Sequence, residues 1–140
     1  MDEKGKPSHV WRRTIPVKDW ADSADRRPKK TLKDIQAEVD RMIRGYQEGY
    51  FSPLGMIARF AEELGELARE VHHRFGEKPK KADEPEGSLE MELGDLFFVL
   101  VSFANAQGID LAEAYEAVMH KYRTRDSRRW TPVDGQGGGR

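Results

Sequence analysis

The chain of 140 residues has the length of one ordinary domain, and 37% of its residues are hydrophobic and 35% charged. Its formal net charge of −1 argues against a broadly basic nucleic-acid binder, so no stable nucleic-acid binding is expected. Cysteine is absent, which excludes disulfides and thiolate metal sites. No apolar run is long enough to span a membrane and no signal-peptide core is present, so we expect a cytoplasmic protein.

The two ends of the chain differ in composition from the part between them. Residues 1–30 are rich in charge and proline and have no sustained periodicity, which predicts a flexible N-terminal extension. The alternative is an arm that docks on a partner subunit through Trp11 and Trp20. Residues 131–140 are rich in glycine, so we expect a disordered tail. Residues 31–130 remain as the folded domain.

Four segments of this domain repeat apolar residues at helical spacing, and none alternates as a strand does. The spacing and the capping residues predict helices from Leu32 to about Gln47, from Pro53 to about Arg74, from Ser88 to about Gln107, and from Asp110 to about Arg125. Asp110 and Glu113 have the spacing of a capping box. The predicted fold class is all-α, with four main helices.

The third predicted helix is the most apolar, and it is apolar on all sides from Leu96 to Val101. Such a helix cannot be buried within one small four-helix unit, so we expect oligomerisation, at least a dimer, to complete the bundle. Glu92 and Asp95 lie one turn apart at its head. A helical projection surrounds Asp95 with Met91 and other mostly apolar residues, so it is expected to be buried and paired with a basic side chain or a metal ion.

Two acidic pairs share the same spacing: Glu63 with Glu66 on the second helix, and Glu92 with Asp95 on the third. Side chains three residues apart lie on one helical face. If the two helices pack antiparallel, four carboxylates can converge, and they cannot all stay ionised without cations between them. Mg²⁺, with Mn²⁺ as a substitute, suits a site made only of carboxylate oxygens.

The motif Glu62-Glu63-Leu64-Gly65-Glu66 and the downstream motif Glu92-Leu93-Gly94-Asp95 resemble the EExxE…ExxD signature of MazG-like nucleotide pyrophosphohydrolases. The resemblance covers about Leu32 to Arg129 and is greatest to the short, single-domain members of the YpjD type. It implies a MazG-like helical bundle and Mg²⁺-dependent hydrolysis of nucleoside triphosphates (NTP or dNTP) between the α and β phosphates. The expected products are nucleoside monophosphate and pyrophosphate, and the implied role is removal of unwanted nucleotides.

The resemblance also implies roles for individual residues. The implied metal ligands are Glu63, Glu66, Glu92 and Asp95, and the implied catalytic carboxylates are Glu62 and Glu63. Lys121 and Arg125, near the end of the last helix, are implied phosphate ligands, although cations there also stabilise the helix dipole without any ligand. Phe51 is the candidate for stacking on the base, with Tyr50 and Trp130 as further candidates. All three aromatics can equally serve a core or an interface.

Other functions remain open from the sequence. A related all-α pyrophosphatase acting on phosphoribosyl-ATP or dUTP would have the same features. A non-catalytic helical oligomerisation module would pair its acids with Arg59 or Arg69. A di-iron bundle needs two Glu-x-x-His motifs, and the chain has one, from Glu70 to His73. His72 and His73 are instead expected to be surface residues near a helix end.

Overall fold

The computed structural model describes residues 29–131, and the expectations for residues 1–28 and 132–140 lie outside this range. The described residues form the helices α2 (Leu32–Arg44), α3 (Pro53–Phe75), α4 (Leu89–Ala106) and α5 (Leu111–Thr124), followed by the short 3-10 helix η1 (Ser127–Arg129). Between residues 29 and 131 there is no strand, so the all-α prediction is confirmed. None of these helices is long and apolar enough to span a bilayer alone.

Short polar side chains begin all four α-helices. The N-cap residues are Thr31, Ser52, Ser88 and Asp110. At α2 the cap is reciprocal, because the Thr31 hydroxyl accepts from the Asp34 amide and the Asp34 carboxylate accepts from the Thr31 amide. The predicted capping box of α5 forms only in part: Asp110 accepts from the Ala112 and Glu113 amides. Each such cap stabilises its helix by about 1 kcal/mol.

The helix ends differ slightly from the predicted ones. α2 ends at Arg44 instead of Gln47, and the following turn reaches Gly49, whose φ of 60° is in the left-handed region. That turn sends the chain toward α3. α3 ends at Phe75, one residue beyond the predicted end.

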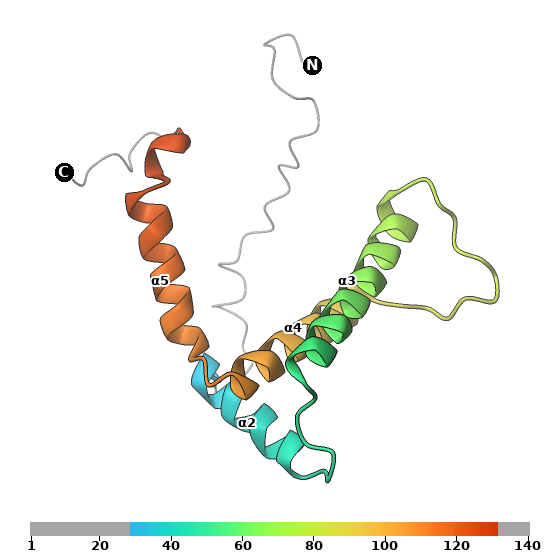
Figure 1. Ribbon diagram of the computed structural model, residues 1–140. Helices are drawn as coiled ribbons and strands as arrows, with labels where there is room; N and C mark the ends of the chain where they lie inside the picture. Colours follow the sequence, from blue (N-terminus) through green and yellow to red (C-terminus); the bar gives the residue numbers. More distant parts are fainter. Residues whose placement is uncertain (1–28, 132–140) are drawn as a thin grey trace.

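α3 and α4 pack side by side along their length as an antiparallel pair, with α2 across one end of the pair (Figure 1). The buried apolar residues come mainly from the meeting point of these helices: Val39 on α2, Met56 on α3, and Val99, Val101 and Ala104 on α4. Within the single chain α4 is not covered on all sides, as expected for a helix that is too apolar to be buried in one four-helix unit. Met91 is 64% exposed and Phe97 38%, because α2 and α3 cover only part of the α4 surface.

A pair of amides fixes the corner between α4 and α5, whose axes are bent by 103°. Gln36 of α2 donates from Nε2 to Asn105 Oδ1 and to the Ile109 carbonyl, both at 2.9 Å, and its Oε1 accepts from the Leu111 amide at 3.0 Å. Asn105 in turn donates to the Gln36 carbonyl at 2.8 Å. One side chain of α2 therefore bonds to the end of α4, the connecting turn and the start of α5. The result is that α5 extends away from the α3–α4 pair (Figure 1).

Candidate metal centre

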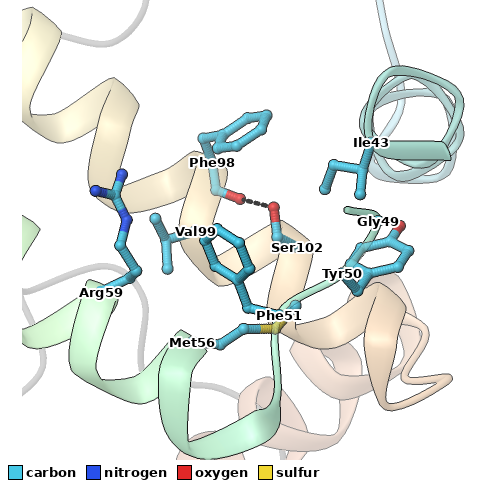
Figure 2. A pocket seen from close by; sticks show the side chains of 9 residues that line it. All are labelled: Ile43, Gly49, Tyr50, Phe51, Met56, Arg59, Phe98, Val99 and Ser102. Atoms are coloured by element: carbon cyan, nitrogen blue, oxygen red, sulfur yellow. Dashed lines mark hydrogen bonds between the residues drawn. The ribbon is translucent and has the colours of Figure 1, made fainter. Parts of the chain in front are cut away.

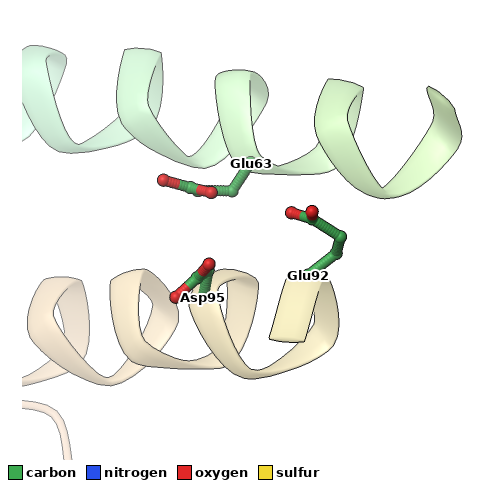
Figure 3. A group of neighbouring side chains, drawn as sticks. All are labelled: Glu63, Glu92 and Asp95. Atoms are coloured by element: carbon green, nitrogen blue, oxygen red, sulfur yellow. The ribbon is translucent and has the colours of Figure 1, made fainter. Parts of the chain in front are cut away.

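Three carboxylates face one another across the gap between α3 and α4 (Figure 3). They belong to Glu63 on α3 and to Glu92 and Asp95 on α4, and each offers one oxygen atom such that all three oxygens lie within 4.8 Å of one another. Antiparallel packing brings this about, because it sets the i, i+3 pair of α4 opposite Glu63. We refer to these three residues as the carboxylate triad. It is the one group of this kind within residues 29–131.

The three members differ in burial. Glu63 is only 6% exposed, and Glu92 is partly buried with an Oε2 atom that is buried and accepts no hydrogen bond. Asp95 is exposed, so the expectation that it is surrounded by packed side chains is wrong for the single chain. The reason is that α3 covers only one side of α4, and α2 lies across the other end of the pair. The costly buried carboxylate is that of Glu63.

Burial is the largest influence on the titration of Glu63, and it raises the pKa of this carboxyl group. The Arg59 guanidinium acts in the opposite direction, and the nearby carboxylates of Glu66, Asp95 and Glu62 raise the pKa further. Ionised Glu63 is therefore short of compensating positive charge, although it has an arginine beside it.

Arg59 is the basic partner that the non-catalytic interpretation required. Its Nη2 atom lies 2.8 Å from Glu63 Oε1, and its Nη1 atom lies 3.7 Å from Glu62 Oε2. Within the described part of the chain, however, neither Glu92 nor Asp95 has an ion-pair partner. One arginine thus meets two carboxylates of α3 and leaves those of α4 uncompensated.

These observations test whether the triad fits a divalent cation. All three donors are hard carboxylate oxygens, which Mg²⁺ and Mn²⁺ prefer. The buried Glu92 Oε2 has a free lone pair, and a cation between the helices would satisfy it while relieving the repulsion felt by Glu63. The residues fit such an ion.

Two other predicted carboxylates lie beside the triad. Glu66 is one turn further along α3, outside the triad, and lines a neighbouring cavity together with Glu92. Glu62 is exposed and forms a long ion pair of 3.7 Å with Arg59. The structure therefore brings together three of the four predicted metal ligands, with the fourth adjacent. The catalytic role of Glu62 stays a prediction.

An apolar cavity of about 180 Å³ lies at the α2 end of the α3–α4 pair (Figure 2). It is lined by Ile43, Gly49, Tyr50, Phe51, Met56, Arg59, Phe98, Val99 and Ser102. Phe51, 58% exposed, comes from the segment before α3, and Arg59 connects this cavity to Glu63. Tyr50 donates its hydroxyl to Asp40 at 2.6 Å. Trp130 is exposed and is not part of the lining.

The predicted phosphate ligands lie elsewhere in the fold. Lys121 and Arg125 are exposed at the end of α5, which packs on α2 and extends away from the triad (Figure 1). The Lys121 ammonium lies 5.0 Å from the ring centroid of Tyr122. The chain by itself does not bring these two side chains to the carboxylates, and their phosphate role stays a prediction.

The expectation that His73 lies on the surface is wrong. Its side chain is 6% exposed, with Nδ1 3.2 Å from the Lys78 carbonyl and Nε2 3.3 Å from a Glu84 carboxylate oxygen. The latter approach suits an ion pair but makes no hydrogen bond. The burial of His73 could have been predicted from the helical spacing of Glu63, Glu66, Glu70 and His73, because this spacing sets His73 on the inner face of α3. Glu70 and His73 are not part of any metal-ligand group in the described residues, which leaves the di-iron alternative without support.

Several known proteins are similar to this chain. Residues 51–130 match the family model of the MazG nucleotide pyrophosphohydrolase domain. The YpjD protein of Bacillus subtilis (strain 168) is 66% identical over 102 residues, which are 73% of this chain and 92% of that protein. The crystal structure of YpjD from Bacillus subtilis is similar with a TM-score of 0.63 and 64% identity, covering 69% of this chain and 99% of that one. A Bacillus-conserved MazG protein, described as a nucleotide pyrophosphohydrolase, has a TM-score of 0.61 and 51% identity, covering 72% and 98% of the two chains.

The family model spans both acidic motifs, and it includes the segment that carries Phe51 and the helix that carries Lys121. The helical pair that forms the triad thus lies within the residues that match the family model. Together the fold, the facing carboxylates and these matches identify the chain as an enzyme of the MazG nucleotide pyrophosphohydrolase family.

Proposed function

We propose that this enzyme hydrolyses nucleoside triphosphates between the α and β phosphates, with Mg²⁺ bound by the carboxylate triad. The observation that carries the proposal is the convergence of Glu63, Glu92 and Asp95 within 4.8 Å, in a setting short of positive charge. The Bacillus-conserved MazG protein, a nucleotide pyrophosphohydrolase, supports the reaction class. Removal of non-standard or excess nucleotides in the cytoplasm is the role we propose for it.

The residues of the chain divide the work by their positions. Glu63, Glu92 and Asp95 would hold the ion, and Glu66, one turn further along α3, would join them or orient a water ligand. A bound Mg²⁺ would supply charge neutralisation for phosphate oxygens and a lowered pKa for a water molecule, and Mn²⁺ would substitute for it. Glu62, exposed beside the triad, is available to accept a proton from water. Phe51 offers its ring to a nucleobase in the apolar cavity.

We also propose that the working enzyme is a homo-oligomer. The uncovered apolar side chains of α4, such as Met91 and Leu93, support this assembly, since large exposed apolar surfaces mark interaction sites. In an oligomer, Lys121 and Arg125 on the projecting α5 can approach a site formed by another copy. This arrangement would reconcile their expected phosphate contacts with their distance from the triad of their own chain.

The experiment that tests this function is product analysis on a panel of canonical and modified nucleoside triphosphates, with dUTP and phosphoribosyl-ATP included. Each is incubated with Mg²⁺, with Mn²⁺ and with EDTA, and pyrophosphate and orthophosphate are measured separately. Pyrophosphate that requires a metal and appears without orthophosphate establishes α–β cleavage and ranks the substrates. Turnover of phosphoribosyl-ATP or dUTP alone would replace the general triphosphate substrate with one of these, and no release from any of them would refute the proposal.

A further inference from the structure

One face of α3 carries a series of residues that line, in turn, the apolar cavity, the triad and a second cavity. The residues, separated by alternating steps of three and four, are Met56, Arg59, Glu63, Glu66, Glu70 and His73. The first two line the apolar cavity, Glu63 belongs to the triad, and the last three line a second cavity. The triad therefore lies between an apolar cavity and a charged one along a single helix.

The second cavity, which we call the loop cavity, has a volume of about 240 Å³. It is enclosed by the C-terminal half of α3, the end of the 76–87 connection and the start of α4, and it shares Glu66 and Glu92 with the surroundings of the triad. Arg69 and Lys80 are basic lining residues, and five glutamates line the cavity as well, so a phosphate ligand would enter it together with a bound cation. Among the residues that the structure describes, neither Arg69 nor Lys80 forms an ion pair.

The absence of partners for these two cations is informative because carboxylates are abundant around them. Glu84, for example, lines the same cavity but accepts a hydrogen bond from the Lys81 amide at 3.1 Å and approaches His73. Arg69 and Lys80 are thus kept free of the acidic side chains nearby. An unpaired arginine and lysine on the wall of a cavity are suited to a phosphate group, which arginine can bind through two parallel hydrogen bonds.

His73 holds the segment that carries Lys80. Its ring contacts the Lys78 carbonyl on one side of Lys80 and approaches the Glu84 carboxylate on the other. Because a carbonyl oxygen only accepts, Nδ1 is the donor in the first contact. This buried anchor keeps the lysine at the cavity wall at the end of α3.

From this order of sites we infer that the loop cavity binds the leaving pyrophosphate, as its magnesium complex, through Arg69 and Lys80. The inference rests on the proposed function and adds the direction in which the substrate lies: base in the apolar cavity, α phosphate at the triad, β and γ phosphates in the loop cavity. Arg69 is six residues beyond Glu63, about 9 Å along the helix axis, and it lines the loop cavity. In the hydrolysis, the water oxygen bonds to the α phosphorus and the bond from this phosphorus to the bridging oxygen breaks. The bridging oxygen and the electron pair leave with pyrophosphate, and one proton is released.

The test measures binding without turnover. Inorganic pyrophosphate is titrated calorimetrically into the full-length protein at saturating Mg²⁺, for the wild type and for Lys80→Ala and Arg69→Ala. Lys78→Ala is the matched control, because it is an exposed lysine of the same connection and does not line the cavity. Lys121→Ala represents the competing location on α5. Circular dichroism verifies that each variant keeps its helices.

We expect Lys80→Ala to weaken pyrophosphate binding about tenfold and Arg69→Ala by a similar factor, since each removes a charge-assisted contact. Lys78→Ala should change it less than about twofold, and binding of nucleoside monophosphate should be unaffected in all of them. The inference is overturned if the wild type binds no pyrophosphate, or if both cavity variants bind it as tightly as the wild type does. It is also overturned if the loss is confined to Lys121→Ala.

Nucleotide hydrolysis measured in parallel separates the two ideas. Turnover with unchanged pyrophosphate affinity in Lys80→Ala and Arg69→Ala would refute the inference and leave the proposed function standing. Pyrophosphate binding with the expected pattern but no turnover of any nucleotide would refute the proposed function and leave the loop cavity as a polyphosphate site.

Discussion

Replacing Glu63 with glutamine distinguishes the effect of the buried carboxylate on folding stability from its role in metal binding. The substitution keeps the shape of the side chain and removes its charge at the most buried position of the triad. Because the pKa of Glu63 is raised above its ordinary value of 4.5, ionisation of this group opposes folding. In wild-type protein free of metal this penalty is fully present above the raised pKa, and it disappears as the pH falls from the raised pKa to the ordinary value. Glu63→Gln therefore removes a penalty at neutral pH.

The expected size of the change follows from the contacts of Glu63. The variant loses an ion pair with Arg59, a residue whose side chain is 48% exposed, so this loss costs about 0.5–1 kcal/mol. Relief of burial and of repulsion from neighbouring carboxylates acts in the opposite direction, so the metal-free variant should be within about 1 kcal/mol of the wild type. Metal at a hundred times its dissociation constant stabilises the wild type by about 2.7 kcal/mol. For a domain of this size that is about 10 °C in Tm.

The assay is thermal unfolding of both proteins with EDTA and with increasing Mg²⁺ or Mn²⁺. The wild-type Tm should rise with metal concentration, and the Tm of Glu63→Gln should stay nearly constant. Glu90→Gln is the matched control, because Glu90 is an exposed glutamate of α4 outside the triad and should leave the metal effect intact. If Glu63→Gln gained as much Tm from the metal as the wild type does, the triad would not be the metal site.

Further predictions concern the remaining parts of the structure. Asp95→Asn should abolish turnover and leave the helical content by circular dichroism near that of the wild type; an active variant would contradict its role as a ligand. Gln36→Leu should lower the free energy of unfolding by about 2 kcal/mol, measured by urea titration, because it deletes three hydrogen bonds at the α4–α5 corner. The pKa of Glu84 is lowered, first by the hydrogen bond from the Lys81 amide, so its contribution to loop order is present above its ordinary value of 4.5 and is lost as the pH falls through the lowered pKa. Limited proteolysis of the 76–87 connection across the acid range should show this loss, and cleavage independent of pH would argue against it. Lys121→Ala should raise KM and leave kcat nearly unchanged, since a phosphate contact present in both ground and transition states contributes uniform binding. If steady-state kinetics gave unchanged KM and kcat, Lys121 would serve only to stabilise the dipole of α5.

Much of the fold was predictable because it depends on local signals. Apolar residues at helical spacing and the capping residues Thr31, Ser88 and Asp110 determine where the helices lie, and the structure has them there. It was also predictable that Glu63 lies opposite the acidic pair of α4, because i, i+3 spacing and antiparallel packing are enough to bring these side chains together.

The parts that were not predicted depend on tertiary contacts. The exposure of Asp95 depends on which helices cover α4, and helical projection of one segment contains no such information. The burial of His73 depends on the path of the 76–87 connection, which has no periodicity to reveal it. The same path decides that Lys80, rather than its neighbours Lys78 and Lys81, lines the loop cavity.

The single helical face that joins both cavities to the triad has a consequence for how the family can diverge. A one-residue insertion between Glu63 and His73 would rotate everything beyond it by about 100° and detach the loop cavity from the metal site. The number of residues between Glu63 and His73 is therefore constrained. The connection between α3 and α4 is free of this constraint, since added length there leaves the helical register untouched. We therefore expect relatives that release a larger or smaller leaving group than pyrophosphate to differ in the length of the 76–87 connection, which carries Lys80.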